Sequence, residues 1–216
     1  MSAPFHVRDR AALSKAVRHL AGACPVLADA HASIGVPDWR RRRGGYAGLA
    51  RIIAFQQVST MAAAAIWARV EDHLGRVTPA TMMQATDEEL RACGLSRPKV
   101  AHLKSIATAV DSGSLNFRRI ARKSDDQARA ELVAVKGVGP WTADVYLMSC
   151  LGRTDVFPHA DIGLSEAYRM LSGEAVRQTP RAFLETGERW RPYRGVAAHL
   201  LWAYINAERQ RQTGGA

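Results

Sequence analysis

The stretch from Glu131 to Leu171, ELVAVKGVGPWTADVYLMSCLGRTDVFPHADIGLSEAYRML, decides the fold predicted for this chain. Just upstream, Ser124-Asp125-Asp126-Gln127 has the pattern of a capping box, which predicts a helix that runs into this stretch. Lys136-Gly137-Val138-Gly139-Pro140 interrupts that helix, because the two glycines permit backbone angles that other residues disfavour. Proline is well tolerated in the first turn of a helix, and apolar residues follow at helical spacing from Trp141. The sequence therefore predicts two helices joined by a tight hairpin.

The hairpin at residues 136–140 has the features of a phosphate-binding turn. Backbone N–H groups around Gly137 and Gly139 precede a helix, where exposed N–H groups and the helix dipole favour an anion. The two glycines alone are better explained by an ordinary connection between two packed helices. Asp161 adds a second feature, because it follows the extended Val156-Phe157-Pro158 and precedes a new segment of helical apolar spacing.

The combined pattern L-x-x-x-x-G-V-G-x-W-T-A followed by D-x-F-P-x-x-D-x-G-L resembles the helix-hairpin-helix DNA glycosylase superfamily. Within it, the chain most resembles the 3-methyladenine DNA glycosylase II branch, from about Gly44 to Tyr204. The resemblance implies two helical lobes with a cleft between them: residues 1–50 with 151–216, and residues 51–150 with the hairpin. The pattern of the residues also favours an all-α fold, because no sustained period-2 alternation is bounded by hairpin turns.

The resemblance also implies site residues. Asp161 would be catalytic, because a carboxylate beneath the sugar stabilises the positive charge that develops there and activates water. It would also cap the helix that follows it. Trp141 and Trp202 would be walls of the base pocket, although either could instead be a core residue. Gln57, from I-x-x-x-Q-Q-x-S, would act as a wedge that fills the gap left by a flipped nucleotide. The predicted DNA contacts are Gln57, Lys136, Gly137, Val138, Gly139 and Thr142.

Position 141 distinguishes two reactions within the family that the chain resembles. Relatives that nick the strand place a lysine directly after G-x-G-x, where this chain has Trp141. We therefore expect a monofunctional glycosylase with water as the nucleophile, acting on cationic alkylated purines such as 3-methyladenine and 7-methylguanine. One alternative is the same mechanism on hypoxanthine, uracil or an oxidised purine. Another is a non-catalytic DNA-binding module, which Asp161 argues against because a phosphate-binding surface has no use for that carboxylate.

Composition agrees with a nucleic-acid partner. The 216 residues have a net charge of +10, which favours an anionic partner, and no apolar run is long enough to suggest a membrane segment. The resemblance implies that this partner is double-stranded DNA with damaged bases. Cys24, Cys93 and Cys150 are too few to supply the four thiolates of an iron–sulfur cluster, and their scatter indicates a reducing compartment. We predict no metal site or cofactor, apart from a monovalent cation that the superfamily can hold at the hairpin carbonyls. We also expect a monomer that is cytoplasmic in bacteria or nuclear in eukaryotes, and not secreted.

Three smaller features have ordinary interpretations. The run Arg40–Arg43 is either a solvated face or a contact to the DNA backbone. Lys99 is predicted to pack along the surface rather than to bind phosphate. Residues 212–216 are predicted to form a frayed tail.

Overall fold

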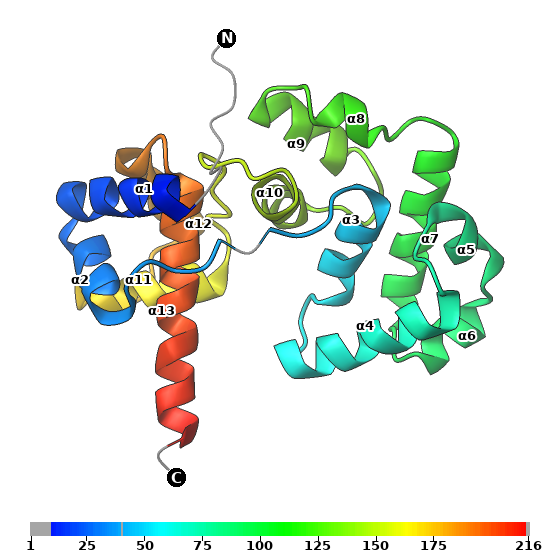
Figure 1. The fold of residues 1–216 in the computed structure, drawn as a ribbon, viewed down its shortest axis with the longest axis horizontal. Coiled ribbons are helices and arrows are strands. Elements are labelled where there is room, and N and C mark those ends of the chain that lie inside the picture. Colours follow the sequence, from blue (N-terminus) through cyan, green and yellow to red (C-terminus); the bar gives the residue numbers. More distant parts are fainter. Residues whose placement is uncertain (1–9, 40, 215–216) are drawn as a thin grey trace. The chain divides into compact units, whose positions relative to one another are not determined.

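The computed structural model describes residues 10–39 and 41–214, and its regular elements are helices joined by short connections (Figure 1). Within those ranges no β-strand is assigned, which confirms the predicted all-α class. The chain divides into two compact units: unit 1 is residues 1–40 and 152–216, and unit 2 is residues 41–151. The boundary predicted near residue 50 falls inside helix α3 (Gly45–Ala54), and the units divide before that helix. The cleft between two lobes stays a prediction. No helix in the described part of the chain is long and apolar enough to cross a membrane.

Unit 1 is organised around its C-terminal helix. Its elements are α1 (Arg10–Ala23), α2 (Pro25–Ile34), α11 (Ile162–Ser172), α12 (Pro180–Gly187), the single 3-10 turn η1 (Glu188–Trp190) and α13 (Arg194–Gly214). Helix α13 packs against α1, α2 and α11, which surround its N-terminal half in Figure 1. Because α13 continues to Gly214, the predicted tail is wrong for residues 212–214.

The segment at residues 153–158 fixes the path of the chain toward Asp161. The N–H of Gly195 at the start of α13 donates to the carbonyl oxygen of Thr154 at 2.6 Å. A Cβ on Gly195 would lie within 3.2 Å of three carbonyl oxygens of this segment, so only glycine allows the approach. The ring of Phe157 then packs against Phe183 and Trp190 in the core of the unit. The segment is therefore held on both sides before it reaches Asp161.

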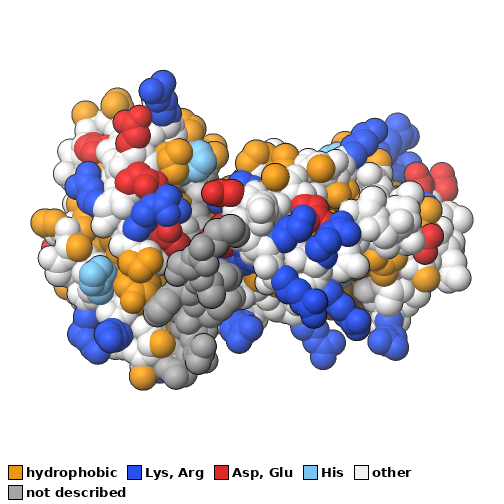
Figure 2. All heavy atoms as spheres, turned by 90° about the horizontal axis from the view of Figure 1, so that it is seen from above, with side chains coloured by type: hydrophobic (Ala, Val, Ile, Leu, Met, Phe, Trp, Pro, Cys, Tyr) orange, Lys and Arg blue, Asp and Glu red, His pale blue; other side chains and the backbone are white. Residues whose placement is uncertain are grey.

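Unit 2 contains the hairpin. Its helices are α3, α4 (Thr60–Leu74), α5 (Pro79–Gln84), α6 (Asp87–Ala92), α7 (Arg97–Asp111), α8 (Phe117–Ile120), α9 (Asp125–Val133) and α10 (Pro140–Ser149). The capping box predicted at Ser124 and Gln127 is present at the start of α9. Helix α10 packs against α3 and α9 and is buried from Thr142 to Ser149, so it has no single apolar stripe. Figure 2 shows Lys and Arg side chains gathered over α8 and α9; Arg118 and Arg122 are exposed there.

An ion pair joins the two helices of the hairpin. Asp144 on α10 has a side chain that is only 4% exposed, and its Oδ1 accepts a hydrogen bond from Arg129 Nε on α9 at 2.5 Å. Arg129 also donates to Asp126, whose side chain is 96% exposed. Sequence patterns did not indicate this pair, because neither residue belongs to a motif. Like Asp161, Asp144 is an acidic residue close to the hairpin in sequence. Its carboxylate, however, is buried and paired with Arg129.

Replacing Arg129 with methionine should lower the free energy of unfolding by about 3 kcal/mol, because it removes a cation that is paired with a buried carboxylate. Chemical denaturation followed by circular dichroism would measure the change. Asp126→Asn is the matched control: it removes the exposed acceptor of the same arginine and should leave the midpoint almost unchanged. Equal effects of the two variants would show that the buried pair does not stabilise the hairpin.

Candidate functional site

Asp161 and Trp202 form one cluster, within unit 1. Asp161 caps α11, as predicted: its Oδ1 accepts a hydrogen bond from the backbone N–H of Leu164 at 2.9 Å. The same oxygen accepts from the indole Nε1 of Trp202 on α13 at 3.2 Å. Both side chains are partly exposed, so Trp202 is not simply a core residue. Two donors from two different helices therefore set the orientation of this carboxylate.

The local sequence leaves room for this contact. A Cβ on Gly163, in the first turn of α11, would lie 3.1 Å from Asp161 Oδ1 and 4.0 Å from Trp202 Cδ1. The contact to the oxygen would be tighter than ordinary packing, so a side chain here would require the carboxylate to shift by a few tenths of an ångström. The glycine in D-x-G-L thus leaves space for the carboxylate.

Trp202 belongs to a layer of three aromatic rings. His199, one helical turn earlier on α13, meets the Trp202 ring edge-on with centroids 5.7 Å apart. The ring of Trp39 stacks on His199, with ring centroids 4.1 Å apart and an interplanar angle of 20°. The His199 Nδ1 lies 3.0 Å from the carbonyl oxygen of Gly195, so this nitrogen carries the proton. The i, i+3 spacing of His199 and Trp202 could have revealed half of the layer, whereas nothing in the sequence places Trp39 beside them.

The hairpin in unit 2 uses its two glycines differently. Gly137 has a φ of 96°, and a Cβ there would lie 2.6 Å from the imidazole of His102 on α7. Gly139 has a φ of −84° and a ψ of 170°, which any residue can adopt, and a Cβ there would meet nothing within 4 Å. The expectation that both glycines relieve backbone strain is therefore wrong for Gly139. Its missing side chain instead leaves open space at the start of α10.

Two of the predicted DNA contacts point into unit 2. Val138 is 4% exposed, and its N–H donates to the carbonyl oxygen of Val135 at 3.0 Å, inside the turn. Thr142 is 2% exposed, and its hydroxyl accepts a hydrogen bond from Gln56 Nε2 at 2.7 Å. Neither side chain is therefore available to contact DNA directly, and the Val138 N–H is already bonded within the turn. Lys136 and Gly139 are exposed, and Gly137 is partly exposed.

The predicted wedge lies in the turn between α3 and α4. Gln57 is exposed and has a φ of 54°; in the described part of the chain no other non-glycine residue has a positive φ. This left-handed conformation costs about 1 kcal/mol or more, and such strain is concentrated at functional positions. Val58 is 39% exposed and Met61, in the first turn of α4, is 83% exposed. Exposed apolar side chains therefore adjoin the polar wedge residue.

The arginine run packs against α3 in part. Arg40 lies outside the described residues, and Arg41 and Arg43 are exposed. The guanidinium of Arg42 lies 5.5 Å from the centre of the Phe55 ring. A Cβ on Gly48 would meet the carbonyl oxygen of Arg43 at 2.0 Å, so the backbone of the run lies directly on α3.

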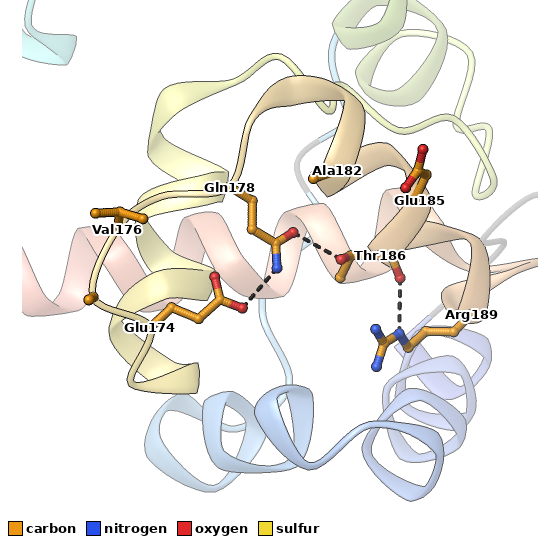
Figure 3. Close-up of a pocket in the computed structure, with 8 residues that line it drawn as sticks. Glu174, Val176, Gln178, Ala182, Glu185, Thr186 and Arg189 are labelled. Atoms are coloured by element: carbon orange, nitrogen blue, oxygen red, sulfur yellow. Dashed lines mark hydrogen bonds between the residues drawn. The ribbon is translucent and has the colours of Figure 1, made fainter.

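A hollow of about 630 Å³ in unit 1 lies beside α12 and does not include Asp161 or Trp202 (Figure 3). Three of its side chains form a chain of hydrogen bonds: Gln178 Nε2 donates to Glu174 at 2.8 Å, and Thr186 donates to Gln178 Oε1 at 2.9 Å.

No group of three metal-binding side chains occurs among the described residues. The three cysteines are buried and free. Burial raises the pKa of Cys150 to about 12, so its thiol is protonated at neutral pH and is a poor nucleophile.

Comparison with known proteins identifies the family. A family model described as an HhH-GPD superfamily base excision DNA repair protein matches residues 50–192. The chain belongs to the HhH-GPD superfamily. DNA-3-methyladenine glycosylase 1 of Schizosaccharomyces pombe is 35% identical over 161 residues, which are 73% of this chain and 71% of that protein. A probable bifunctional transcriptional activator and DNA repair enzyme of Mycobacterium tuberculosis is 34% identical over 72% of this chain, but the match covers only 32% of that protein.

A solved structure shows the same fold. The 3-methyladenine DNA glycosylase of Schizosaccharomyces pombe in complex with abasic DNA has a TM-score of 0.79 and 32% identity to this chain. The match covers 87% of this chain and 95% of that one. The HhH-GPD range includes Gln57, the hairpin and Asp161, whereas Trp39, His199 and Trp202 lie outside it. The aromatic layer is therefore not part of the matched HhH-GPD region.

The contrast between the hairpin glycines gives a testable prediction for this HhH-GPD protein. Gly137→Val should cost at least about 3 kcal/mol of stability, because the side chain meets His102 and the backbone has a positive φ. Gly139→Val should cost no more than about 1 kcal/mol, as for a poor N-cap, yet it should weaken binding of damaged and undamaged DNA alike. Thermal unfolding and fluorescence anisotropy would measure the two effects. Unchanged DNA affinity in Gly139→Val would show that no phosphate approaches this turn.

Proposed function

We propose that this chain is a monofunctional DNA glycosylase that hydrolyses the N-glycosidic bond of alkylated purines in double-stranded DNA. The observation that carries the proposal is the carboxylate of Asp161, held by the Leu164 N–H and the Trp202 indole. Membership of a superfamily of base excision DNA repair proteins supports it. So does the similarity over most of the chain to a relative named DNA-3-methyladenine glycosylase 1.

The mechanism follows from the charge that develops as the base leaves. Cleavage of the N-glycosidic bond turns the sugar into an oxocarbenium-like cation, which a fixed carboxylate stabilises more than it stabilises the neutral sugar. Because Asp161 is already oriented by two donors, it needs no reorganisation when this charge appears. The same carboxylate orients or deprotonates the water that attacks the sugar. The reaction as proposed requires water and no cofactor.

Aromatic surface beside the carboxylate supports alkylated purines as substrates. The partly exposed indole of Trp202 is backed by His199, which is itself stacked on Trp39. Methylation at N3 or N7 gives a purine nucleoside a positive charge, and an aromatic face attracts such a cation by about 0.5 to 2 kcal/mol. A cationic base also leaves as a neutral molecule, so the reaction does not depend on a strong general acid.

DNA would be bound at the hairpin and opened at the wedge. The open space at Gly139 lies at the N-terminus of α10, which attracts phosphate, and the exposed Lys136 adds a positive charge. Contacts of this kind bind the backbone without reading sequence, as a search for damage requires. Gln57 would occupy the gap in the base stack after the damaged nucleotide is flipped out.

The substrate is tested directly by product analysis. Duplexes that each contain one modified base, namely 3-methyladenine, 7-methylguanine, hypoxanthine, uracil or 8-oxoguanine, are incubated with the protein, and the free bases are separated by chromatography. The alkylated purines should be released. Release of one of the other bases alone would reassign the substrate and keep the mechanism.

Asp161→Asn should reduce single-turnover base release by on the order of a hundred- to a thousandfold, because it removes the charge that stabilises the sugar cation. The amide oxygen can still cap α11 and accept from Trp202, so the fold and DNA affinity should remain. Asp126→Asn, which removes an exposed carboxylate elsewhere, should keep full activity. Normal turnover by Asp161→Asn would assign catalysis to another residue.

The monofunctional assignment predicts intact abasic strands as the product. Nicking requires a neutral amine that attacks C1′ and remains attached as an imine, and the indole N–H of Trp141 has no nucleophilic lone pair to offer. Product strands should break only after alkali, and borohydride present during the reaction should trap no protein–DNA adduct. A borohydride-dependent adduct that survives denaturation would overturn the assignment. Its loss in Lys136→Met would then identify the amine.

A further inference from the structure

The side chain of Lys99 ends beneath the turn that carries Gln57. Its Nζ donates to two backbone carbonyl oxygens, those of Ala54 and Gln56, each at 2.8 Å. Ala54 is the last residue of α3, and Gln56 directly precedes the residue with a φ of 54°. The lysine lies on α7, more than 40 residues away in sequence, so a tertiary contact fixes this turn.

The chemistry of the contact suits a lysine. The last carbonyl groups of a helix have no partner within the helix, and they carry the negative end of the helix dipole. An ammonium group with three donors can satisfy two such oxygens at once. Burial lowers the pKa of Lys99, which shows that desolvation of the charge opposes this placement. The hydrogen bonds to the turn offset part of that cost.

A second hydrogen bond connects the turn to α10. The side-chain amide of Gln56 donates to the hydroxyl of Thr142 at 2.7 Å. Thr142 is buried in the first turn of α10. The residue before Gln57 is therefore bonded through its carbonyl oxygen to α7 and through its amide to α10. Gln57 itself is exposed, so its backbone is held while its side chain faces solvent.

We propose that Lys99 is a positioning residue for DNA opening: it holds the Gln56–Gln57 turn in its left-handed conformation, so that Gln57 can enter the base stack without further ordering of the turn. The proposal rests on the wedge role given to Gln57 in the proposed function. It assigns no contact between Lys99 and DNA, because the ammonium group donates to backbone oxygens of the turn.

The test separates gap filling from backbone binding and does not depend on catalysis. Dissociation constants are measured for two duplexes of the same sequence, one undamaged and one with a tetrahydrofuran abasic analogue that presents a gap. Lys99→Met should weaken binding of the abasic duplex about tenfold and leave the undamaged duplex nearly unaffected. Lys104→Met is the matched control on the same helix, since Lys104 pairs with Asp87 and not with the turn, and it should leave both constants unchanged.

A double-mutant cycle with Gln57→Ala shows whether Lys99 acts through Gln57. If it does, Lys99→Met should add little to the loss already caused by Gln57→Ala. Thr142→Val removes the hydrogen bond from Gln56 and should give the same selective loss of affinity for the abasic duplex. This variant keeps the test available if Lys99→Met folds poorly. Additive losses in the cycle, or equal weakening for both duplexes, would overturn the role of Lys99. If Gln57→Ala weakens binding of the abasic duplex but Lys99→Met and Thr142→Val do not, the role of Lys99 is overturned and the wedge role of Gln57 stands. If Gln57→Ala does not weaken that binding, the wedge role itself is rejected.

Discussion

The orientation of the Asp161 carboxylate depends on two hydrogen bonds to its Oδ1, and the rest of unit 1 is arranged so that both can form. One comes from the first turn of α11 and the other from Trp202 on α13, so the carboxylate is oriented only while these helices keep their register. Three close approaches maintain it: Gly195 lies on residues 153–156, Gly187 on the ring of Phe157, and Gly163 beside the carboxylate. A side chain at these three positions would press on the backbone of residues 153–156, on the ring of Phe157 or on the carboxylate itself.

Unit 2 holds the residues predicted to contact DNA by close packing and buried polar contacts. Gly137 fits against His102, and Asp144 is joined to Arg129 across the two helices of the hairpin. Lys99 holds the end of α3 by two carbonyl oxygens. The exposed groups, Gly139 and Gln57, contribute little to this packing themselves. Their positions are set by neighbours that cannot reach a ligand, which is the arrangement expected of a preorganised binding surface.

Local signals in the sequence predicted the helices well, and tertiary contacts account for what was missed. The capping box at Ser124 and the proline at position 140 act within a few residues, so the ends of α9 and α10 could be predicted. The family pattern led to Asp161. The burial of Val138 and Thr142 depends on partners that local spacing does not reveal, and Gln56, the partner of Thr142, lies 86 residues away. The stack of Trp39 on His199 and the two bonds of Lys99 likewise join segments that no periodicity connects.

Under the proposed mechanism, Trp202 joins two effects that act at different stages of the reaction. An alkylated purine is charged before the bond breaks, so attraction to an aromatic face favours the bound substrate. As the bond breaks, that charge passes from the base to the sugar, and the aromatic attraction weakens while the attraction to the carboxylate grows. Only the second change lowers the barrier, because catalysis requires binding that is stronger in the transition state than in the ground state. On this mechanism the ring of Trp202 would contribute to the choice of substrate, and its N–H, which donates to Asp161, would contribute to the rate.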